Sequence, residues 1–371
     1  MDRRKKIFIN ASTVLFSGGL ILSQSIIETL IAEDCFEITI TCPRYGPYKD
    51  FETKHSLIKV VPPWMLHRLL RWVHDCFWLP VICRRENPDL VLTLGNLPAR
   101  THYKQIFLHD NPFLIEKNLS YIPLSITSLF IHKFRCILTL QRMSFVNLIL
   151  VQTEYQKQGL NLIINGDKPI KVLTPHIPIV RNPNQTYKLP IFPLNNKIKI
   201  LCLSRYYEHK NIEKLFEVAQ IIKARGLPFI IYLTISKNHG KKARQLIKSI
   251  NTGNFNDILI NIGHSHHNNV PGIVNQVDAI ILPSLLESFS LSCIEAWKYR
   301  KPLFTSNLDS LKSSCGKAAF YFNPFSASDI LKCLTDAYKN PDQISTIINE
   351  GDKRLNELSK WSEYSALIKD F

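Results

Sequence analysis

The sequence predicts an α/β fold of two domains, each organised around a parallel sheet. Three observations support this prediction: a length of 371 residues, segments of strand length that alternate with helical stretches, and a proline-rich interruption near the middle. A chain of this length is too long for one compact core and is sufficient for two domains. Strands that alternate with helices form βα units, and such units give parallel sheets.

The first half contains short apolar segments of strand length. Helical stretches separate most of them, including residues 21–32, where apolar residues recur near the helical period. A tight turn is expected at residues 16–19, which include Gly18 and Gly19. The strands expected in this half are residues 6–9, 36–41, 57–61, 89–94, 105–108, 148–152 and 170–173.

A segment with five prolines, at positions 175, 178, 183, 190 and 193, predicts a linker because proline disrupts helices and central strands. After it the strand–helix pattern restarts. We expect a first domain at 1–180, a linker at 181–197, a second domain at 198–350 and a final helix at 351–371. The strands expected in the second domain are 198–203, 229–234, 258–262, 279–282, 302–305 and 319–322, and the helices are 211–224, 241–250, 270–277 and 290–299.

The chain is basic, with a net charge of +16 and a pI near 9.4. Nucleic acid, an anionic membrane surface or a phosphate-bearing substrate could each explain this charge. No helix-turn-helix, zinc-finger or RNP-type pattern is present, so nucleic acid is not expected as a partner. The nine cysteines are scattered without zinc spacing, which favours reduced thiols and a cytoplasmic protein.

Residues 62–83 begin with an aromatic and basic stretch that includes Trp64, Arg68 and Trp72. This composition suits a peripheral contact with an anionic membrane, here the inner face of the cytoplasmic membrane. Packing in the core of the first domain explains it equally well. No segment has the roughly 20 mostly apolar residues needed to span a bilayer. The basic N-terminus imitates a signal peptide, but polar residues interrupt its apolar run, so a signal sequence is the weaker interpretation.

Two glutamates eight positions apart, Glu287 and Glu295, are the most informative feature of the second domain. Glu287 follows the expected strand 279–282, and Glu295 lies one to two turns into the expected helix 290–299. Open α/β sheets bind ligands at the carboxyl ends of their strands. The first N–H groups of the helix can hold a phosphate. A carboxylate only accepts hydrogen bonds, so the glutamates would bind hydroxyls of a sugar or ribose on the same ligand.

The run from Leu282 to Trp297 resembles the E-x7-E motif of retaining GT-B glycosyltransferases, family 4 of the glycosyltransferase classification. Residues 301–307 are similar to the family's next strand, and residues 315–324 to its G-x-A-A-x-Y-F-D-P stretch. The resemblance is strong from about 198 to 330 and patchy before. It implies a GT-B fold, in which two Rossmann-like domains face across a cleft. It also implies an acceptor-binding first domain, a nucleotide-sugar-binding second domain, and a final helix that returns to the first domain.

The resemblance implies transfer of a sugar from a nucleotide diphosphate sugar to a hydroxyl of a glycan or lipid-linked glycan, with retention, in bacterial O-antigen, capsule or lipopolysaccharide biosynthesis. Glu287 would contact the transferred sugar near the reacting carbon, and Glu295 would bind the ribose. Backbone groups of Ser288, Phe289, Ser290 and Leu291 would hold phosphate or sugar. The family often has Glu-Gly-Phe-Gly where residues 287–290 are Glu-Ser-Phe-Ser, and the serines can cap the helix. Arg300 stands where the family usually has glycine.

Arg205 and Lys210 follow the first strand of the second domain. With Asn211 they resemble the family's G-R-x-x-x-x-K-N loop, in which Ser204 replaces the glycine. The resemblance implies that both cations neutralise the diphosphate, whose charge grows as it leaves. No Asp-x-Asp motif is present, so we expect chemistry without a metal or other cofactor. The alternative is a solvated basic loop.

In the first domain, Gly18 and Gly19 would let the backbone approach a ligand closely. The resemblance places such a loop under the donor phosphates. His109 resembles the family histidine that faces the donor sugar, where it could act on a hydroxyl. Asp110 would then lie on the acceptor side. An ordinary turn and a structural histidine are the alternatives.

Two other functions remain open. An inverting GT-B transferase or a sugar-nucleotide epimerase could use the same architecture. A non-catalytic basic protein that binds an anionic membrane or nucleic acid is the alternative from another class. Stabilisation by nucleotide sugars would separate the enzymes from the binding protein, and the anomer of the product would separate retention from inversion.

Overall fold

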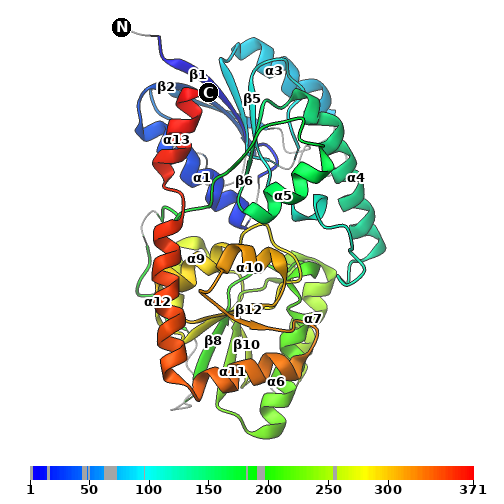
Figure 1. Cartoon of the computed structure of the whole chain (residues 1–371), viewed down its shortest axis with the longest axis vertical. Helices are drawn as coiled ribbons and strands as arrows, with labels where there is room; N and C mark the ends of the chain where they lie inside the picture. Colours follow the sequence, from blue (N-terminus) through cyan, green and yellow to red (C-terminus); the bar gives the residue numbers. More distant parts are fainter. Residues whose placement is uncertain are drawn as a thin grey trace. The chain divides into compact units, whose positions relative to one another are not determined.

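The protein is described by a computed structural model that covers residues 3–14, 17–43, 48, 51–61, 73–95, 97–180, 183–189, 197–253 and 257–371. The chain divides into two compact units (Figure 1). Unit 1 comprises Met1–Asn118, Ser125–Ile179 and Leu358–Phe371, and unit 2 comprises Leu119–Leu124 and Val180–Glu357. Each unit contains one parallel sheet with helices, which confirms the predicted α/β fold.

Unit 1 contains a seven-stranded parallel sheet in the order β3-β2-β1-β4-β5-β6-β7. Its inner strands β4, β5 and β6 are buried along their whole length, as expected for a parallel sheet covered on both faces. The strands are β1 (Lys5–Asn10), β2 (Phe36–Pro43), β3 (Ser56–Val61), β4 (Leu90–Thr93), β5 (Gln105–Leu108), β6 (Leu148–Val151) and β7 (Ile170–Val172).

Alternate residues of β1 enter different core clusters, because successive side chains of a strand point to opposite faces. Ile7 and Ile9 pack with α1, whereas Phe8 packs with α3. The sheet is therefore covered on both faces. The helices of unit 1 are α1 (Ser17–Ala32), the π-helix η3 (His74–Trp78), α3 (Leu79–Glu86), α4 (Ile126–Arg142), α5 (Glu154–Ile163) and α13 (Trp361–Asp370).

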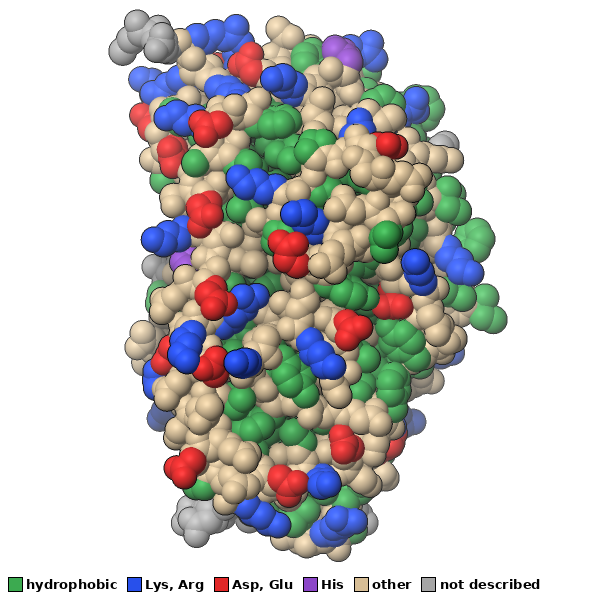
Figure 2. All heavy atoms as spheres, viewed as in Figure 1, with side chains coloured by type: hydrophobic (Ala, Val, Ile, Leu, Met, Phe, Trp, Pro, Cys, Tyr) green, Lys and Arg blue, Asp and Glu red, His purple; other side chains and the backbone are tan. Residues whose placement is uncertain are grey.

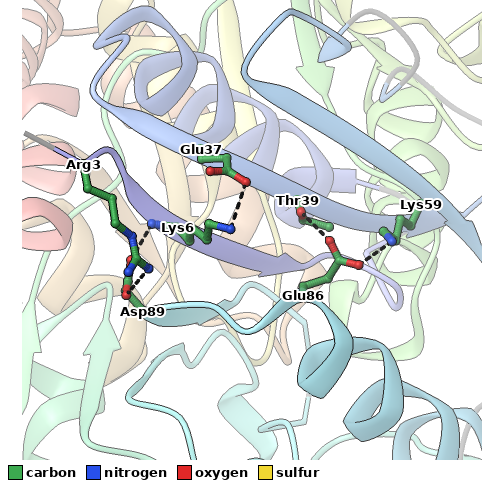
Figure 3. Close-up of polar contacts among 7 residues, drawn as sticks. All are labelled: Arg3, Lys6, Glu37, Thr39, Lys59, Glu86 and Asp89. Carbon is green, nitrogen blue, oxygen red and sulfur yellow. Dashed lines mark hydrogen bonds and ion pairs between the residues drawn. The ribbon is translucent and has the colours of Figure 1, made fainter. Parts of the chain in front are cut away.

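Polar contacts join β1 to β2, and join β2 and β3 to helix α3 (Figure 3). Lys6 Nζ lies 3.4 Å from Glu37 Oε1. Glu86, the last residue of α3, reaches back to the sheet: its carboxylate lies 2.5 Å from Lys59 Nζ and accepts a 3.2 Å hydrogen bond from Thr39. These contacts fix Glu86 against the sheet.

The last helix, α13, belongs to the core of unit 1. Tyr364 is 1% exposed and its hydroxyl donates a 2.7 Å hydrogen bond to the carbonyl of Leu173. The indole of Trp361 donates to Ile177 O at 3.0 Å, and Lys5 Nζ donates to the carbonyl of Ile368 near the end of the helix.

Unit 2 contains a six-stranded parallel sheet in the order β10-β9-β8-β11-β12-β13. One large apolar cluster joins its central strands to α6, α7 and α11. The strands are β8 (Ile198–Cys202), β9 (Phe229–Leu233), β10 (Leu259–Asn261), β11 (Ala279–Leu282), β12 (Leu303–Ser306) and β13 (Phe320–Phe322). The helices are α6 (Glu213–Arg225), α7 (Lys241–Thr252), α8 (Val270–Asn275), α9 (Leu291–Lys298), α10 (Asp309–Cys315), α11 (Ala327–Tyr338) and α12 (Pro341–Glu357).

The predicted tight turn at 16–19 is wrong in its described part. Gly18 and Gly19 lie in the first turn of α1, which begins at Ser17. Glycine is unfavourable inside a helix but acceptable in a first turn, and the apolar residues that follow continue the helix. Of residues 62–83, on which a membrane contact was predicted, residues 62–72 lie outside the described residues. Of the expected linker, Asn184 N donates to Asn268 O at 2.7 Å, within unit 2. No helix in the described part of the chain is both long and apolar enough to cross a membrane.

Candidate active site

The strand order of unit 2 has a topological switch point between β8 and β11. The chain runs outward from β8 to β9 and β10, then returns to β11 on the other side of β8. In open α/β sheets, ligands bind at such a switch point, outside the carboxyl ends of the strands. The loop after β8 carries Arg205 and Lys210, and the loop after β11 carries Glu287. The fold therefore places three predicted site residues at this point.

Lys210 and Glu287 form an ion pair across the switch point. Lys210 Nζ lies 2.5 Å from Glu287 Oε1, and the two side chains are 16% and 7% exposed. The backbones of the two loops are also joined, because Leu285 N donates a 2.7 Å hydrogen bond to His209 O. The pair thus has a fixed position at the carboxyl edge of the sheet.

Helix α9 begins at the same edge. Ser292 Oγ in its first turn donates to Leu203 O at 2.8 Å, which holds the helix against the end of β8. Ser290 is the N-cap residue with extended backbone, but its side chain forms no capping hydrogen bond, so the predicted serine cap is wrong at this residue. The first N–H groups of α9 are not capped by Ser290 and suit an anion.

Glu295 is the fifth residue of α9, as predicted, and is 3% exposed. Within the described residues no group donates a hydrogen bond to its carboxylate. Burial raises the pKa of Glu295 to about 7, and the charge of Lys298 opposes this rise. A buried acid without a hydrogen-bond donor is costly for the fold, which makes it a candidate for ligand binding.

Arg205 lies in the loop after β8, with its guanidinium 5.8 Å from the ring of Tyr207. His239, which the sequence analysis did not identify, supports this loop. Its Nδ1 accepts hydrogen bonds from Tyr206 N at 3.3 Å and Ser236 N at 3.0 Å. Burial, together with the charge of Arg205, lowers the pKa of His239 to about 4. His239 is therefore a neutral acceptor that positions the residue beside Arg205. The sequence signal that could have identified His239 is Ser236, three residues earlier, which forms a capping box with it.

Two further matches to the family pattern are explained by backbone geometry. Asn211 has a left-handed backbone, with φ of 53°, and its Nδ2 donates to Pro324 O at 2.9 Å. This bond ties the cationic loop to the end of the 315–324 stretch. Arg300 also has a left-handed backbone, with φ of 52°, where the family usually has glycine. That conformation favours glycine, so Arg300 adopts it at an energetic cost.

In unit 1, His109 follows β5 and is fully buried. Neither of its ring nitrogens has a hydrogen-bond partner among the described residues. Burial lowers the pKa of His109 to about 4, so the ring is neutral at pH 7. A neutral imidazole has one donor and one acceptor nitrogen, so it can hydrogen-bond a hydroxyl.

The first turn of α1 lies against the loop after β5. A Cβ atom on Gly19 would lie 3.2 Å from Asp110 Oδ2, so this approach favours glycine. Burial raises the pKa of Asp110 to about 6, and the charge of Arg135 opposes the rise. Gly18, Gly19, His109 and Asp110 thus lie at the carboxyl ends of β1 and β5. In the parts of the chain that are described, no group of three or more His, Cys, Asp or Glu side chains could hold a metal ion.

Residues 188–354 match the family model described as Glycosyl transferases group 1. This range includes Arg205, Lys210, Glu287 and Glu295. No curated protein sequence matches the chain.

Solved structures match the chain over nearly its whole length. Sucrose-phosphate synthase from Thermosynechococcus elongatus aligns with a TM-score of 0.71 and 14% identity, covering 99% of this chain and 98% of that one. WaaG, a glycosyltransferase involved in lipopolysaccharide biosynthesis, aligns with a TM-score of 0.70 and 11% identity, covering 98% and 99%. HepE from Anabaena, in complex with UDP-glucose, aligns with a TM-score of 0.69 and 14% identity, covering 98% of each chain.

At these identities the structural likeness defines the fold, which is GT-B. The family match over unit 2 adds the class of protein: the chain is a glycosyltransferase.

Proposed function

We propose that the protein transfers a sugar from a nucleoside diphosphate sugar to a hydroxyl of a glycan or lipid-linked glycan, with retention of configuration and without a metal ion. The observation that carries the proposal is the Lys210–Glu287 ion pair at the switch point of the unit that matches the family. HepE is in complex with UDP-glucose and the E. coli trehalose-6-phosphate structure is bound with UDP-2-fluoro glucose, so UDP-hexoses are the first donors to test.

The diphosphate of the donor is assigned to the electropositive edge of unit 2. Arg205 and Lys210 supply two cations, and residues 288–291 at the start of α9 supply N–H groups. A leaving diphosphate gains negative charge in the transition state, so fixed positive groups lower the barrier. This arrangement supports a reaction that does not depend on a metal. We also assign Gly18 and Gly19 of unit 1 to the donor phosphates, because their backbone can approach a ligand closely.

The two glutamates are assigned to hydroxyl groups. Glu287 accepts hydrogen bonds from the transferred sugar, and Glu295 accepts them from the ribose. Lys210 orients Glu287 by direct contact at 2.5 Å. Two donated hydroxyl bonds would give the carboxylate of Glu295 the partners that it lacks among the described residues.

In the reaction, the bond between the anomeric carbon and the diphosphate oxygen breaks, and a bond forms from the acceptor oxygen to that carbon on the same face. The acceptor proton passes to the departing diphosphate oxygen, and a nucleoside diphosphate leaves. His109, neutral at pH 7, is assigned to hydrogen-bond a sugar hydroxyl or the acceptor. Asp110 is assigned to the acceptor side.

We place this reaction in the cytoplasm, in bacterial O-antigen, capsule or lipopolysaccharide biosynthesis. The likeness to WaaG, which is involved in lipopolysaccharide biosynthesis, supports this setting. An acceptor hydroxyl on a growing surface polysaccharide is the corresponding substrate class.

Thermal unfolding with a panel of UDP-, GDP-, ADP- and TDP-sugars tests the donor assignment. One class of nucleotide should raise Tm, and Glu295→Ala and Arg205→Ala should each remove the shift. Lys248→Ala, an exposed change on α7, is the matched control and should retain it. No response to any donor would favour a non-catalytic basic protein.

Product analysis separates the remaining enzymes. NMR of the product of the responding donor should show the donor's anomeric configuration, and activity should survive treatment with EDTA. The opposite anomer would identify an inverting transferase, and an isomerised nucleotide sugar without an acceptor would identify an epimerase.

A further inference from the structure

Helix α4 presents a row of large apolar side chains to solvent. Their exposed fractions are 88% for Ile126, 71% for Phe130, 48% for Phe134 and 53% for Ile137. The spacing of four, four and three residues puts them on one face of the helix. Single exposed apolar residues are ordinary, but a contiguous apolar face indicates an interaction surface. Figure 2 shows hydrophobic side chains over α4 at the right-hand edge of the view.

A second exposed apolar pair lies beside the end of this helix. Phe77 on η3 is 65% exposed and Val81 on α3 is 56% exposed. The two sites are connected because Arg142, the last residue of α4, donates to Cys76 Sγ at 3.1 Å and to Pro98 O at 3.2 Å. In Figure 1, α3 lies at the top of unit 1 and α4 runs down its right side. We call Ile126, Phe130, Phe134, Ile137, Phe77 and Val81 the apolar edge.

The charges around the apolar edge are positive. Helix α4 contains no Asp or Glu, and exposed Lys133 lies within its apolar row. Arg84 and Arg85 are exposed in the last turn of α3, and no carboxylate pairs with either among the described residues. Of the nearby acids in the sequence, Asp75 is 4% exposed and lies against His74, and Glu86 is fixed to Lys59 and Thr39 on the sheet (Figure 3).

We propose that the apolar edge docks unit 1 on an anionic lipid bilayer, with α4 in the plane of the interface. An interfacial helix buries its apolar face at the boundary between headgroups and acyl chains, while basic residues bind anionic headgroups. Phe130 and Phe134 enter that boundary, and Lys133, Arg84 and Arg85 contact the headgroups. A symmetric contact between two copies would instead bring these unpaired cations near one another, which is unfavourable. The inference does not depend on the donor or the reaction.

Vesicle flotation tests the proposal with the full chain. The probes are vesicles of phosphatidylcholine and phosphatidylglycerol in equal parts, compared with phosphatidylcholine alone. Wild type should bind the mixed vesicles more tightly. Phe130→Ser/Phe134→Ser should reduce binding by about tenfold or more, because membrane binding then no longer removes two large apolar side chains from water. Phe325→Ser is the matched control, since Phe325 is 49% exposed but belongs to unit 2.

Charge reversal gives an independent measurement. Lys133→Glu should weaken binding to the mixed vesicles by about tenfold and leave binding to phosphatidylcholine nearly unchanged. Lys248→Glu, at an exposed position on α7 of unit 2, should bind as wild type does. All these side chains are exposed, so Tm should stay within the range of the controls. If the double serine variant does not fold, Phe77→Ser replaces it.

Three outcomes would overturn the proposal. The first is a wild-type protein that does not bind the mixed vesicles. The second is equal binding by wild type and the apolar-edge variants. The third is a wild-type dimer without lipid that Phe130→Ser/Phe134→Ser converts to a monomer, because the face would then be an interface between copies. Donor-induced stabilisation is measured without lipid, so a failure here is distinct from a failure of the proposed reaction.

Discussion

The ammonium group of Lys210 contacts the carboxylate of Glu287, although the two residues are 77 positions apart in the sequence. Each follows one of two adjacent parallel strands, β8 and β11. The contact therefore results from the strand order of unit 2, which brings two distant loops to the same edge. Replacing either residue therefore removes the charge that stabilises the other.

Replacing Lys210 with Met should leave Glu287 buried without its cation. Loss of one partner of a buried pair costs about 3–5 kcal/mol of unfolding free energy. Transfer activity should fall by about 10²–10³-fold if Lys210 stabilises the leaving group. Urea unfolding and kcat/KM measure the two effects.

Two controls accompany this variant. Lys210→Met/Glu287→Gln should recover most of the stability but none of the activity. Lys214→Met removes an exposed pair with Glu217 in α6 and should cost less than about 1 kcal/mol. A fully active Lys210→Met protein would refute the role assigned to the pair.

The pH dependence of stability should reveal the carboxyl of Glu295. Its pKa in the folded protein, about 7, is above its usual value of 4.5, so the folded state retains a proton that the unfolded state loses in this range. The unfolding free energy should therefore fall as pH rises through this range. Glu295→Gln should remove up to ~3 kcal/mol of this dependence.

The measurement is urea unfolding of wild type and Glu295→Gln at about pH 4 and about pH 8. Glu217→Gln, at an exposed site on α6, should keep the wild-type dependence. The same change of unfolding free energy with pH in wild type and Glu295→Gln would show that burial does not raise the pKa of this carboxyl.

His109 should have the opposite effect on stability. Its pKa is lowered from 6.5 to about 4, so the unfolded state binds a proton that the folded state does not. Stability should decrease as pH falls through this range. His109→Leu should remove the decrease and be more stable than wild type near about pH 5, because the ring nitrogens of His109 also lack partners among the described residues. Activity should fall by about tenfold or more if the ring binds a hydroxyl.

Tm and kcat/KM against pH measure these changes, and His102→Leu, an exposed substitution in unit 1, is the control. Loss of stability without loss of activity in His109→Leu would assign the residue a structural role.

Removing the ring of Tyr364 should destabilise unit 1 strongly. The side chain is almost fully buried, so Tyr364→Ala should cost about 3–5 kcal/mol. Tyr364→Phe should cost only about 1 kcal/mol, for the lost bond to Leu173 O. If the two units unfold in separate transitions, the donor should raise the Tm of unit 2, and Tyr364→Ala should lower the Tm of unit 1.

Most strands and helices could be predicted from the sequence because their apolar periods are clear. The strand 279–282 matches β11, and Glu295 lies in the following helix as expected. The turn at Gly18 and Gly19 was wrong because glycine composition alone does not distinguish a turn from the first turn of a helix. The cap by Ser290 was wrong because residue type gives preference, whereas the rotamer depends on the surroundings.

Long-range contacts of the site could not be predicted in the same way. The bond of Asn211 to Pro324, the support of the Arg205 loop by His239, and the lack of a donor to Glu295 among the described residues each depend on how separate loops pack. The sequence places Arg205 and Asn211 after a strand and Glu295 in a helix, but it contains no direct signal for their partners. The assignment of residues 119–124 to unit 2 is likewise a property of tertiary packing.

The division of the chain has a consequence for biosynthesis. Tyr364 and Ile368 fill the same apolar cluster as Ile7 and Ile26, yet all of residues 180–357 are translated between them. A ribosome therefore completes unit 2 while one face of the first sheet still lacks its last helix. Because domains fold as units during synthesis, unit 1 completes its core only after Leu358–Phe371 are made. The nascent N-terminal sheet would then expose apolar surface to chaperones until α13 emerges.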